Sequence, residues 1–225
     1  MSTDWRDHLA SLEAGRFLRV VNFHNTPHAK RDNYARQFDA LAKQFAPVGD
    51  ASLDQLFDNG SWASDRPGVI LAFYEGYRDH FDVAAPLLDE FGLVGWFFVP
   101  TAFLDVPALD QVEYARDRYL GIIPDEYPDG RHAMTWDELA SIGKRHVVAG
   151  HTANHVSAAS IATADDIERE VRVPARRLEE VLGRQPAHFA WLFGQAFGSN
   201  PIADDALRAA GFRYIFSNTR IQRIA

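Results

Sequence analysis

Short apolar runs alternate with amphipathic segments along nearly the whole chain, and this alternation restricts the possible folds more than any other feature. Each run has the length of a buried strand, and the segments between runs have the spacing of helices. Strands that alternate with helices form a parallel sheet covered by helices, so we expect an α/β fold. The predicted strands are 17–23, 69–74, 94–99, 146–149, 188–193 and 213–216, and the predicted helices lie near 31–45, 78–91, 136–144, 164–182 and 202–210.

Local signals mark several helix boundaries. Thr135 followed by Glu138 is the pattern of a capping box, in which each side chain binds a free backbone N–H of the first turn. Asn200 is expected to cap the last helix. Pro86 and Pro174 lie inside predicted helices, and because proline has no N–H to donate we expect a kink or a break at each.

Residues 103–134 do not fit this alternation. The segment is rich in Asp, Pro and Tyr and has no clean period, so we expect an irregular insertion within a single domain that covers residues 1–225. Long loops on α/β scaffolds often bind ligands, and a variable surface loop is an equally good reading.

Charge and composition exclude several classes of partner. The net charge of −8 argues against nucleic acid, which needs a basic surface, and no run of Lys and Arg favours an anionic membrane. No apolar stretch reaches the roughly 18 residues of a membrane span. The first residues resemble no signal peptide, so the chain reads as cytoplasmic. There is no cysteine, so any metal must be held by histidines and carboxylates.

Polar residues follow several predicted strands, where parallel α/β folds place their reacting groups. His151 and His155 are four residues apart, and two imidazoles at this spacing can bind one ion. The spacing alone is weak evidence, because the chain has nine histidines and His24 and His28 form a second such pair. A metal site and ordinary histidines both remain open on this evidence.

Four segments together resemble the polysaccharide deacetylases, also known as carbohydrate esterase family 4. Residues 72–79 read A-F-Y-E-G-Y-R-D, where the family has T-F-D-D-G followed by Y-R-D. His151 to His155 match its H-[ST]-x-x-H motif, and Phe189 to Gly194 resemble F-A-Y-P-[FY]-G. Phe23 and His24 resemble the Y-H pair of the subgroup that acts on poly-N-acetylglucosamine and related exopolysaccharides. The likeness runs from about residue 18 to 218.

The resemblance implies a distorted (β/α) barrel of seven or eight strands and a metal-dependent hydrolase that removes N-acetyl groups from an N-acetylated sugar or polysaccharide. It implies a divalent metal, zinc in our expectation, held by Glu75, His151 and His155. The partner it implies is a carbohydrate, with no nucleic acid and no membrane span. The sequence gives no indication of the oligomeric state.

The chain departs from the family at residues that carry the chemistry. Tyr74 occupies the position of the general base, and a phenol with a pKa of about 10 does not accept a proton at neutral pH as a carboxylate does. Glu75 replaces the ligand aspartate, and glutamate is a competent ligand in other zinc sites. Leu192 stands where the family has proline. The late L-x-H acid is missing, and His24 is either its substitute or an ordinary structural histidine.

We expect Tyr74, Glu75 and His24 to take part in catalysis, and Asn25, Trp191 and Phe193 to contact the substrate. Trp191 either stacks on a sugar ring or packs in the core.

Three explanations of the altered motif remain open. The protein is a deacetylase with an altered base, such as Glu75 itself or the nearby Asp79, a catalytically degenerate carbohydrate-binding relative, or a metal-free cyclic-amide hydrolase of the same fold. The intact pair of His151 and His155 argues against the third explanation, since that subgroup holds no metal.

Overall fold

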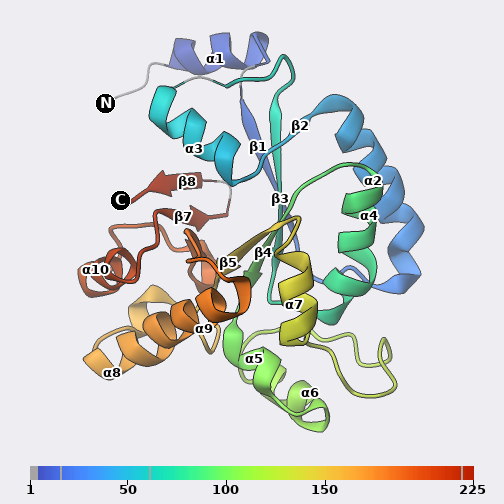
Figure 1. Ribbon diagram of the computed structural model, residues 1–225, viewed down its shortest axis with the longest axis vertical. Helices are drawn as coiled ribbons and strands as arrows, with labels where there is room; N and C mark the ends of the chain where they lie inside the picture. The colour runs from blue at the N-terminus through green and yellow to red at the C-terminus, as the bar shows by residue number, and fades with distance from the viewer. Residues whose placement is uncertain (1–4, 16, 61, 219) are drawn as a thin grey trace.

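The computed structural model describes residues 5–15, 17–60, 62–218 and 220–225 (Figure 1). The strands are β1 (Leu18–Phe23), β2 (Ala46–Pro47), β3 (Gly68–Tyr74), β4 (Gly95–Val99), β5 (Val147–Gly150), β6 (His188–Ala190), β7 (Tyr214–Ser217) and β8 (Arg220–Arg223). The α-helices are α1 (Trp5–Glu13), α2 (Arg31–Gln44), α3 (Asp50–Asn59), α4 (Ala85–Glu90), α5 (Thr101–Asp105), α6 (Gln111–Arg116), α7 (Trp136–Ile142), α8 (Ala164–Ile167), α9 (Val173–Leu182) and α10 (Pro201–Ala209).

The strands form one sheet in the order β1-β3-β4-β5-β6-β7-β8, with the short β2 paired to the start of β3. All neighbours are parallel except β7 and β8, which form an antiparallel pair. The sheet curls into a nearly closed barrel, and the helices surround it (Figure 1). The prediction of an α/β barrel is therefore confirmed, and each of the six predicted strands is present.

Both faces of the barrel strands are buried, which is why the sequence shows continuous apolar runs rather than alternating ones. Successive side chains of a strand point to opposite faces. In β3, Val69, Leu71 and Phe73 pack outward in a core shared with α2, α4 and α7, whereas Ile70, Ala72 and Tyr74 pack inward with Trp96 and Phe98 of β4. Tyr74 therefore lies inside the barrel, at the carboxyl end of its strand.

The two prolines inside predicted helices do not break them. A π-helical turn, His80–Ala84, leads directly into α4, and a second, Glu168–Arg172, leads into α9. Pro86 and Pro174 each fall in the first turn of the α-helix that follows, where the N–H they lack is not needed. Where the sequence predicts a kink or a break, the structure instead has a π-helical turn just before each proline.

The expectation of an irregular segment over 103–134 is wrong for its first half. Residues 111–116 form α6, because Tyr114 stacks on Phe103 and Ala115 is fully buried against the same cluster. Residues 117–134 contain only turns and one isolated bridge, Tyr77 to Ala133.

Helix α3 binds the last strands of the sheet through three aspartates spaced one turn apart. Asp50, Asp54 and Asp58 lie on one face of the helix, as their four-residue spacing requires. Their partners come from the chain near β6, β7 and β8: Asp50 binds His188 and Arg184, Asp54 binds Arg213 and Tyr214, and Asp58 binds Arg223. Leu53, on the inner side of the helix, packs into the barrel core.

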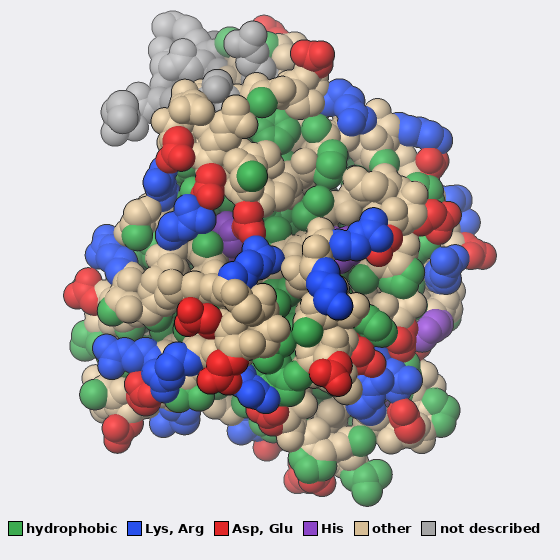
Figure 2. Space-filling model, in the orientation of Figure 1, with side chains coloured by type: hydrophobic (Ala, Val, Ile, Leu, Met, Phe, Trp, Pro, Cys, Tyr) green, Lys and Arg blue, Asp and Glu red, His purple; other side chains and the backbone are tan. Residues whose placement is uncertain are grey.

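The visible surface carries both signs of charge. On the face in Figure 2, basic and acidic side chains are interspersed rather than gathered into one patch. No described helix is both long and apolar enough to cross a membrane.

Candidate metal centre

Three predicted ligands converge at the carboxyl end of the barrel. Glu75 directly follows β3, and His151 and His155 lie in the loop that follows β5. One ligand atom from each side chain lies within 4.8 Å of the others. Oε1 of Glu75 is 3.7 Å from Nε2 of His155, and all three side chains are buried.

Backbone carbonyls orient both imidazoles. Nδ1 of His151 donates to the carbonyl oxygen of Ala190 at 2.7 Å, and Nδ1 of His155 donates to that of Arg118 at 2.6 Å. A carbonyl oxygen only accepts, so the proton of each neutral ring is on Nδ1 and the lone pair is on Nε2. Metal-binding histidines are commonly held in this way.

The site is energetically unsatisfied without a cation. Within the described part of the chain, Oε2 of Glu75 and Nε2 of His155 are buried and have no hydrogen-bond partner. Burial raises the pKa of Glu75 to about 8 and lowers the pKa of His151 to about 3. A divalent cation would satisfy the unpaired atoms and stabilise the carboxylate, so these residues fit a metal.

The loop that carries the two histidines is fixed from outside. Two N–H groups at the start of α5 donate to the carbonyl oxygens of Thr152 and Ala153, at 3.2 and 3.0 Å. The buried carboxylate of Glu170 accepts from both the backbone and the side-chain nitrogen of Asn154, each at 2.9 Å. Neighbouring elements therefore set the positions of the ligands.

Backbone strain is concentrated at this end of the barrel. A left-handed φ is uncommon for residues other than glycine and costs of order 1–3 kcal/mol. All but one of the described non-glycine residues with such a φ also line the cavity at the metal site, and the exception, Thr152, lies between the two histidines. The described non-glycine residues with a left-handed φ, the exception included, are Glu75, Tyr119, Thr152, His155, Phe193 and Asn218.

The cavity at the metal site has a volume of about 210 Å³. Tyr74 and His24 form part of its wall, with their rings 5.8 Å apart. Burial and the charge of Glu75 raise the pKa of Tyr74 above its usual range, so its hydroxyl stays protonated and acts as a donor. Nε2 of His24 lies 3.4 Å from Oε1 of Glu75, and its side chain is largely exposed.

The loop after β1 is held by residues that follow β3. Nε2 of His80 donates to the carbonyl oxygen of His24 at 2.7 Å. The backbone N–H of Thr26 donates to the carboxylate of Asp79 at 2.9 Å. His80 and Asp79 are both buried, so His24 projects into the cavity from a fixed backbone.

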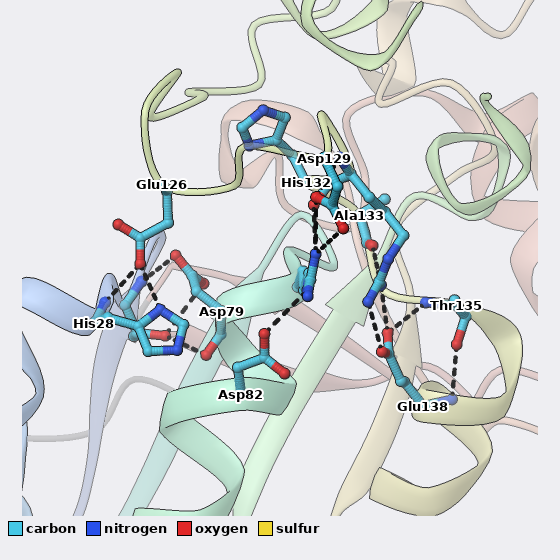
Figure 3. Close-up of polar contacts among 12 residues, drawn as sticks. His28, Asp79, Asp82, Glu126, Asp129, His132, Ala133, Thr135 and Glu138 are labelled. Atoms are coloured by element: carbon cyan, nitrogen blue, oxygen red, sulfur yellow. Dashed lines mark hydrogen bonds and ion pairs between the residues drawn. The ribbon is translucent and has the colours of Figure 1, made fainter. Parts of the chain in front are cut away.

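Side-chain hydrogen bonds and ion pairs fix the irregular segment 117–134 to the loops after β1 and β3 and to α7. Figure 3 shows these contacts between the segment and the barrel. Arg131 also donates to a backbone carbonyl of its own segment, that of Ala133. The pairs are Glu126 with His28 at 2.7 Å, Asp129 with Arg78 at 2.8 Å, and Arg131 with Glu138 at 2.7 and 2.9 Å. The segment therefore holds the carbonyl of Arg118 and the ring of Tyr119 beside the cavity.

The three predicted substrate contacts differ in where they lie relative to the cavity. Phe193 is 70% exposed at the rim of the cavity, where its ring centroid is 5.8 Å from that of Tyr119. Trp191 also borders the cavity, but it is only 1% exposed and packs on Phe189 in the outer core, so little of its ring is free to stack on a sugar.

The third predicted contact, Asn25, is not in the cavity lining. The chain turns toward α2 after β1, and the carbonyl oxygen of Asn25 accepts from the hydroxyl of Tyr34 at 3.1 Å. The side chain of Asn25 lies beside Gly121 of the segment 117–134, where Oδ1 would be 3.6 Å from a Cβ on that glycine.

Sequence reasoning did not find Asn22, Tyr119 and Asn218, which also line the cavity. Asn22 and Asn218 are polar residues within or just after strands, which is a usable signal. Tyr119 gives no local signal. Gly194 has a left-handed φ, and a Cβ there would lie 2.7 Å from the side chain of Asn218, so glycine is needed where the two loops meet.

Comparison with known proteins agrees with the resemblance drawn from the motifs. Residues 63–215 match the family model for polysaccharide deacetylase. The poly-beta-1,6-N-acetyl-D-glucosamine N-deacetylase of Escherichia coli (strain K12) is 23% identical over 236 aligned positions. The match covers 88% of this chain and 33% of the relative, so the chain spans about a third of that protein's length.

Solved structures show the same fold. A de-N-acetylase from Aggregatibacter actinomycetemcomitans has a TM-score of 0.66 at 17% identity, with 92% of this chain and 91% of that one covered. IcaB from Ammonifex degensii has a TM-score of 0.66 at 18% identity, with coverage of 90% and 86%.

Proposed function

The chain belongs to the polysaccharide deacetylase family, and from this membership we propose that it hydrolyses the N-acetyl amide of a β-1,6-linked N-acetylglucosamine polymer with the help of zinc. The convergence of Glu75, His151 and His155 carries the proposal. Two imidazoles and one carboxylate are a donor set of catalytic zinc sites that leaves a coordination position open. The curated relative named above supports the choice of polymer.

The metal would supply a Lewis acid that polarises the acetamide carbonyl and makes a water molecule more acidic. Glu75, His151 and His155 would hold it, with Nδ1 of each imidazole kept on its backbone carbonyl. Tyr74 keeps its proton and donates a hydrogen bond to the carbonyl oxygen as negative charge develops there.

In the proposed mechanism His24 moves the proton that the family's aspartate moves. Its imidazole lines the cavity beside Glu75, and desolvation of the part of the ring that faces the protein lowers its pKa, so the ring is neutral and can accept a proton. A water oxygen attacks the carbonyl carbon as His24 takes its proton. The carbon–nitrogen bond then breaks, and His24 gives the proton to the leaving nitrogen, which yields acetate and a free amine.

Acetate release from β-1,6-linked N-acetylglucosamine oligomers tests this proposal. Glu75→Ala is expected to abolish both zinc binding and turnover. His24→Ala is expected to keep the zinc and lower kcat by about 10²–10⁴-fold, the usual contribution of a general acid–base group. Lys30→Ala is the control, because it removes an exposed side chain from the same loop after β1. A protein that binds no divalent ion, or a His24→Ala variant with full kcat, contradicts the mechanism.

A second candidate is a carbohydrate-binding relative without turnover. One observation favours it: Tyr74, which occupies the position of the base, is buried and stays protonated. Tyr74→Asp separates the two, since a silent wild type that gains activity on this substitution supports the binding role. The cluster of three ligands counts against the metal-free alternative.

A further inference from the structure

The loop after β1 is bound by two adjacent residues that follow β3. The carbonyl oxygen of His24 accepts from Nε2 of His80 at 2.7 Å. Two residues further along the loop, the N–H of Thr26 donates to the carboxylate of Asp79 at 2.9 Å, and its hydroxyl donates to the backbone carbonyl of Asp79 at 3.1 Å. Residues 24–27 form no helix or strand, so bonds of this kind, rather than a regular element, hold the backbone there.

The position of the His24 ring depends on this backbone. The side chain is 65% exposed, so packing holds little of it. Within the cavity its Nε2 lies 3.4 Å from Oε1 of Glu75, and its ring centroid lies 5.8 Å from that of Tyr74. Because a displacement of about 1 Å at a reacting group can cost about 10²-fold in rate, the groups that fix this backbone bear on any proton transfer by His24.

The bond to His24 explains why residue 80 is a histidine. His80 is fully buried, and its ring centroid lies 5.5 Å from those of Phe73 and Tyr77 and 5.9 Å from that of Phe97. Its Nδ1 is buried and has no hydrogen-bond partner among the described residues. A phenylalanine would suit these aromatic neighbours without an unpaired nitrogen, but it could not donate to His24.

The geometry of Asp79 excludes it as the base that acts on the substrate. The residue is 2% exposed, and it is not in the lining of the metal-site cavity. Its two carboxylate oxygens accept from the N–H and the hydroxyl of Thr26, at 2.9 and 3.2 Å. A general base must lie within hydrogen-bond reach of the proton that it takes. Asp79 therefore acts on the loop after β1 and not on the substrate.

We propose that Asp79 and His80 are positioning residues for the deacetylation, which hold Nε2 of His24 beside Glu75 by fixing the backbone of the loop after β1. This inference rests on the proposed function, in which His24 moves the proton. Neither positioning residue lines the cavity, so their loss should lower kcat and leave zinc affinity and KM unchanged.

A double-mutant cycle tests the inference on acetate release from β-1,6-linked N-acetylglucosamine oligomers by the zinc-loaded protein. Asp79→Ala removes the acceptor, and His80→Phe removes the donor while a ring still fills the aromatic core. We expect each to lower kcat by about 10–100-fold. In the His24→Ala background each should cost less than about two-fold more, because the group that they position is gone. A general structural role would cost the same in both backgrounds.

Two further variants separate positioning from other roles. Asp79→Asn should keep most of kcat, because its amide oxygen can accept from the N–H of Thr26 and its nitrogen can donate to the hydroxyl. A base at this position would lose as much activity with Asn as with Ala. Asp204→Ala is the matched control: Asp204 is also buried and accepts from a loop N–H, that of Gly198 at 2.8 Å, but both residues lie outside the cavity lining. This variant should keep kcat.

The NMR signals of the His24 imidazole give a readout that needs no turnover. They are identified by their loss in His24→Ala and recorded on zinc-loaded protein without substrate. We expect one sharp set in the wild type and in Asp79→Asn, and broadened or doubled signals in Asp79→Ala and His80→Phe. If Asp79→Ala does not fold, His80→Phe decides the outcome.

Unchanged His24 signals in both disruptive variants, or equal losses of kcat with and without His24, would overturn the inference. The proposed hydrolysis is scored separately. A wild type that releases no acetate, but whose His24 signals change in the variants, contradicts the hydrolysis and leaves the positioning of His24 standing. Acetate release with unchanged His24 signals supports the hydrolysis and contradicts the positioning.

Discussion

The backbone carbonyl of Arg118 accepts a hydrogen bond of 2.6 Å from Nδ1 of His155. The two residues are far apart in the sequence, and Arg118 belongs to the irregular segment 117–134. The bond determines which nitrogen of His155 carries the proton, and so which one is free to bind a metal. The segment therefore contributes to the metal site through its backbone, without supplying a ligand.

Releasing this segment should weaken metal binding. Arg131 anchors it to Glu138 through two hydrogen bonds, and Arg131→Ala removes both. Loss of the partners that orient metal ligands typically lowers affinity 10–100-fold, and because other contacts still hold the segment we expect about ten-fold. Competition with a chelator measures the zinc affinity. Arg145→Ala, which removes a largely exposed arginine paired with Asp89, should leave it unchanged.

Glu170 should support the loop that carries the two histidines. Glu170→Gln leaves one oxygen to serve the two nitrogens of Asn154, so the loop between His151 and His155 loses part of its support. We expect zinc affinity to fall by about 10–100-fold. Glu168→Gln changes a half-exposed carboxylate in the same helical stretch and serves as the control. Equal affinities in the two variants would show that the contact with Asn154 is not needed.

Two aspartates of α3, Asp54 and Asp58, should contribute unequally to the free energy of unfolding. Asp54 accepts two hydrogen bonds from Arg213 and one from the hydroxyl of Tyr214. We expect Asp54→Asn to lower the free energy of unfolding by about 1–2 kcal/mol, because these bonds to a charged group are only partly screened by solvent. Asp58→Asn, which affects a more exposed pair with Arg223, should cost less than about 1 kcal/mol. Urea unfolding distinguishes the two, and similar losses would contradict this ranking.

Asp79 should make the stability of the fold depend on pH. Desolvation by burial raises its pKa from 3.8 to about 7, against the hydrogen bonds from Thr26, while Glu126 raises it and His28 lowers it through their charges. The folded chain therefore binds this proton more tightly than the unfolded chain. The stabilisation is fully present below about pH 4 and is lost as the pH rises toward 7.

Asp79→Asn mimics the protonated side chain and cannot ionise. The difference in unfolding free energy between the variant and the wild type should therefore shift in favour of the variant from pH 4 to pH 7. Urea unfolding at several pH values measures this difference. A difference that stays constant over this range would show that Asp79 does not titrate in it.

The sequence by itself indicated the six main strands and the larger helices between them, and its resemblance to the polysaccharide deacetylases indicated the ligands of the candidate metal site. Both follow from local patterns: apolar runs of strand length predict buried strands, and β3 and β5 end where Glu75 and His151 begin their loops. Because parallel strands end at the same edge of a barrel, and because the motifs together resemble those of the family, we expected these side chains to converge, which the spacing of His151 and His155 alone did not establish.

Only the tertiary structure decided what surrounds those ligands. The carbonyl of Arg118, the exposed ring of Tyr119 and the partners of Asp54 come from segments far apart along the chain, and no local propensity encodes which of them meet. The same holds for Trp191, whose position at a strand end predicts neither the core nor the cavity. Its ring entered the core because packing against Phe189 in the outer layer buries it almost completely.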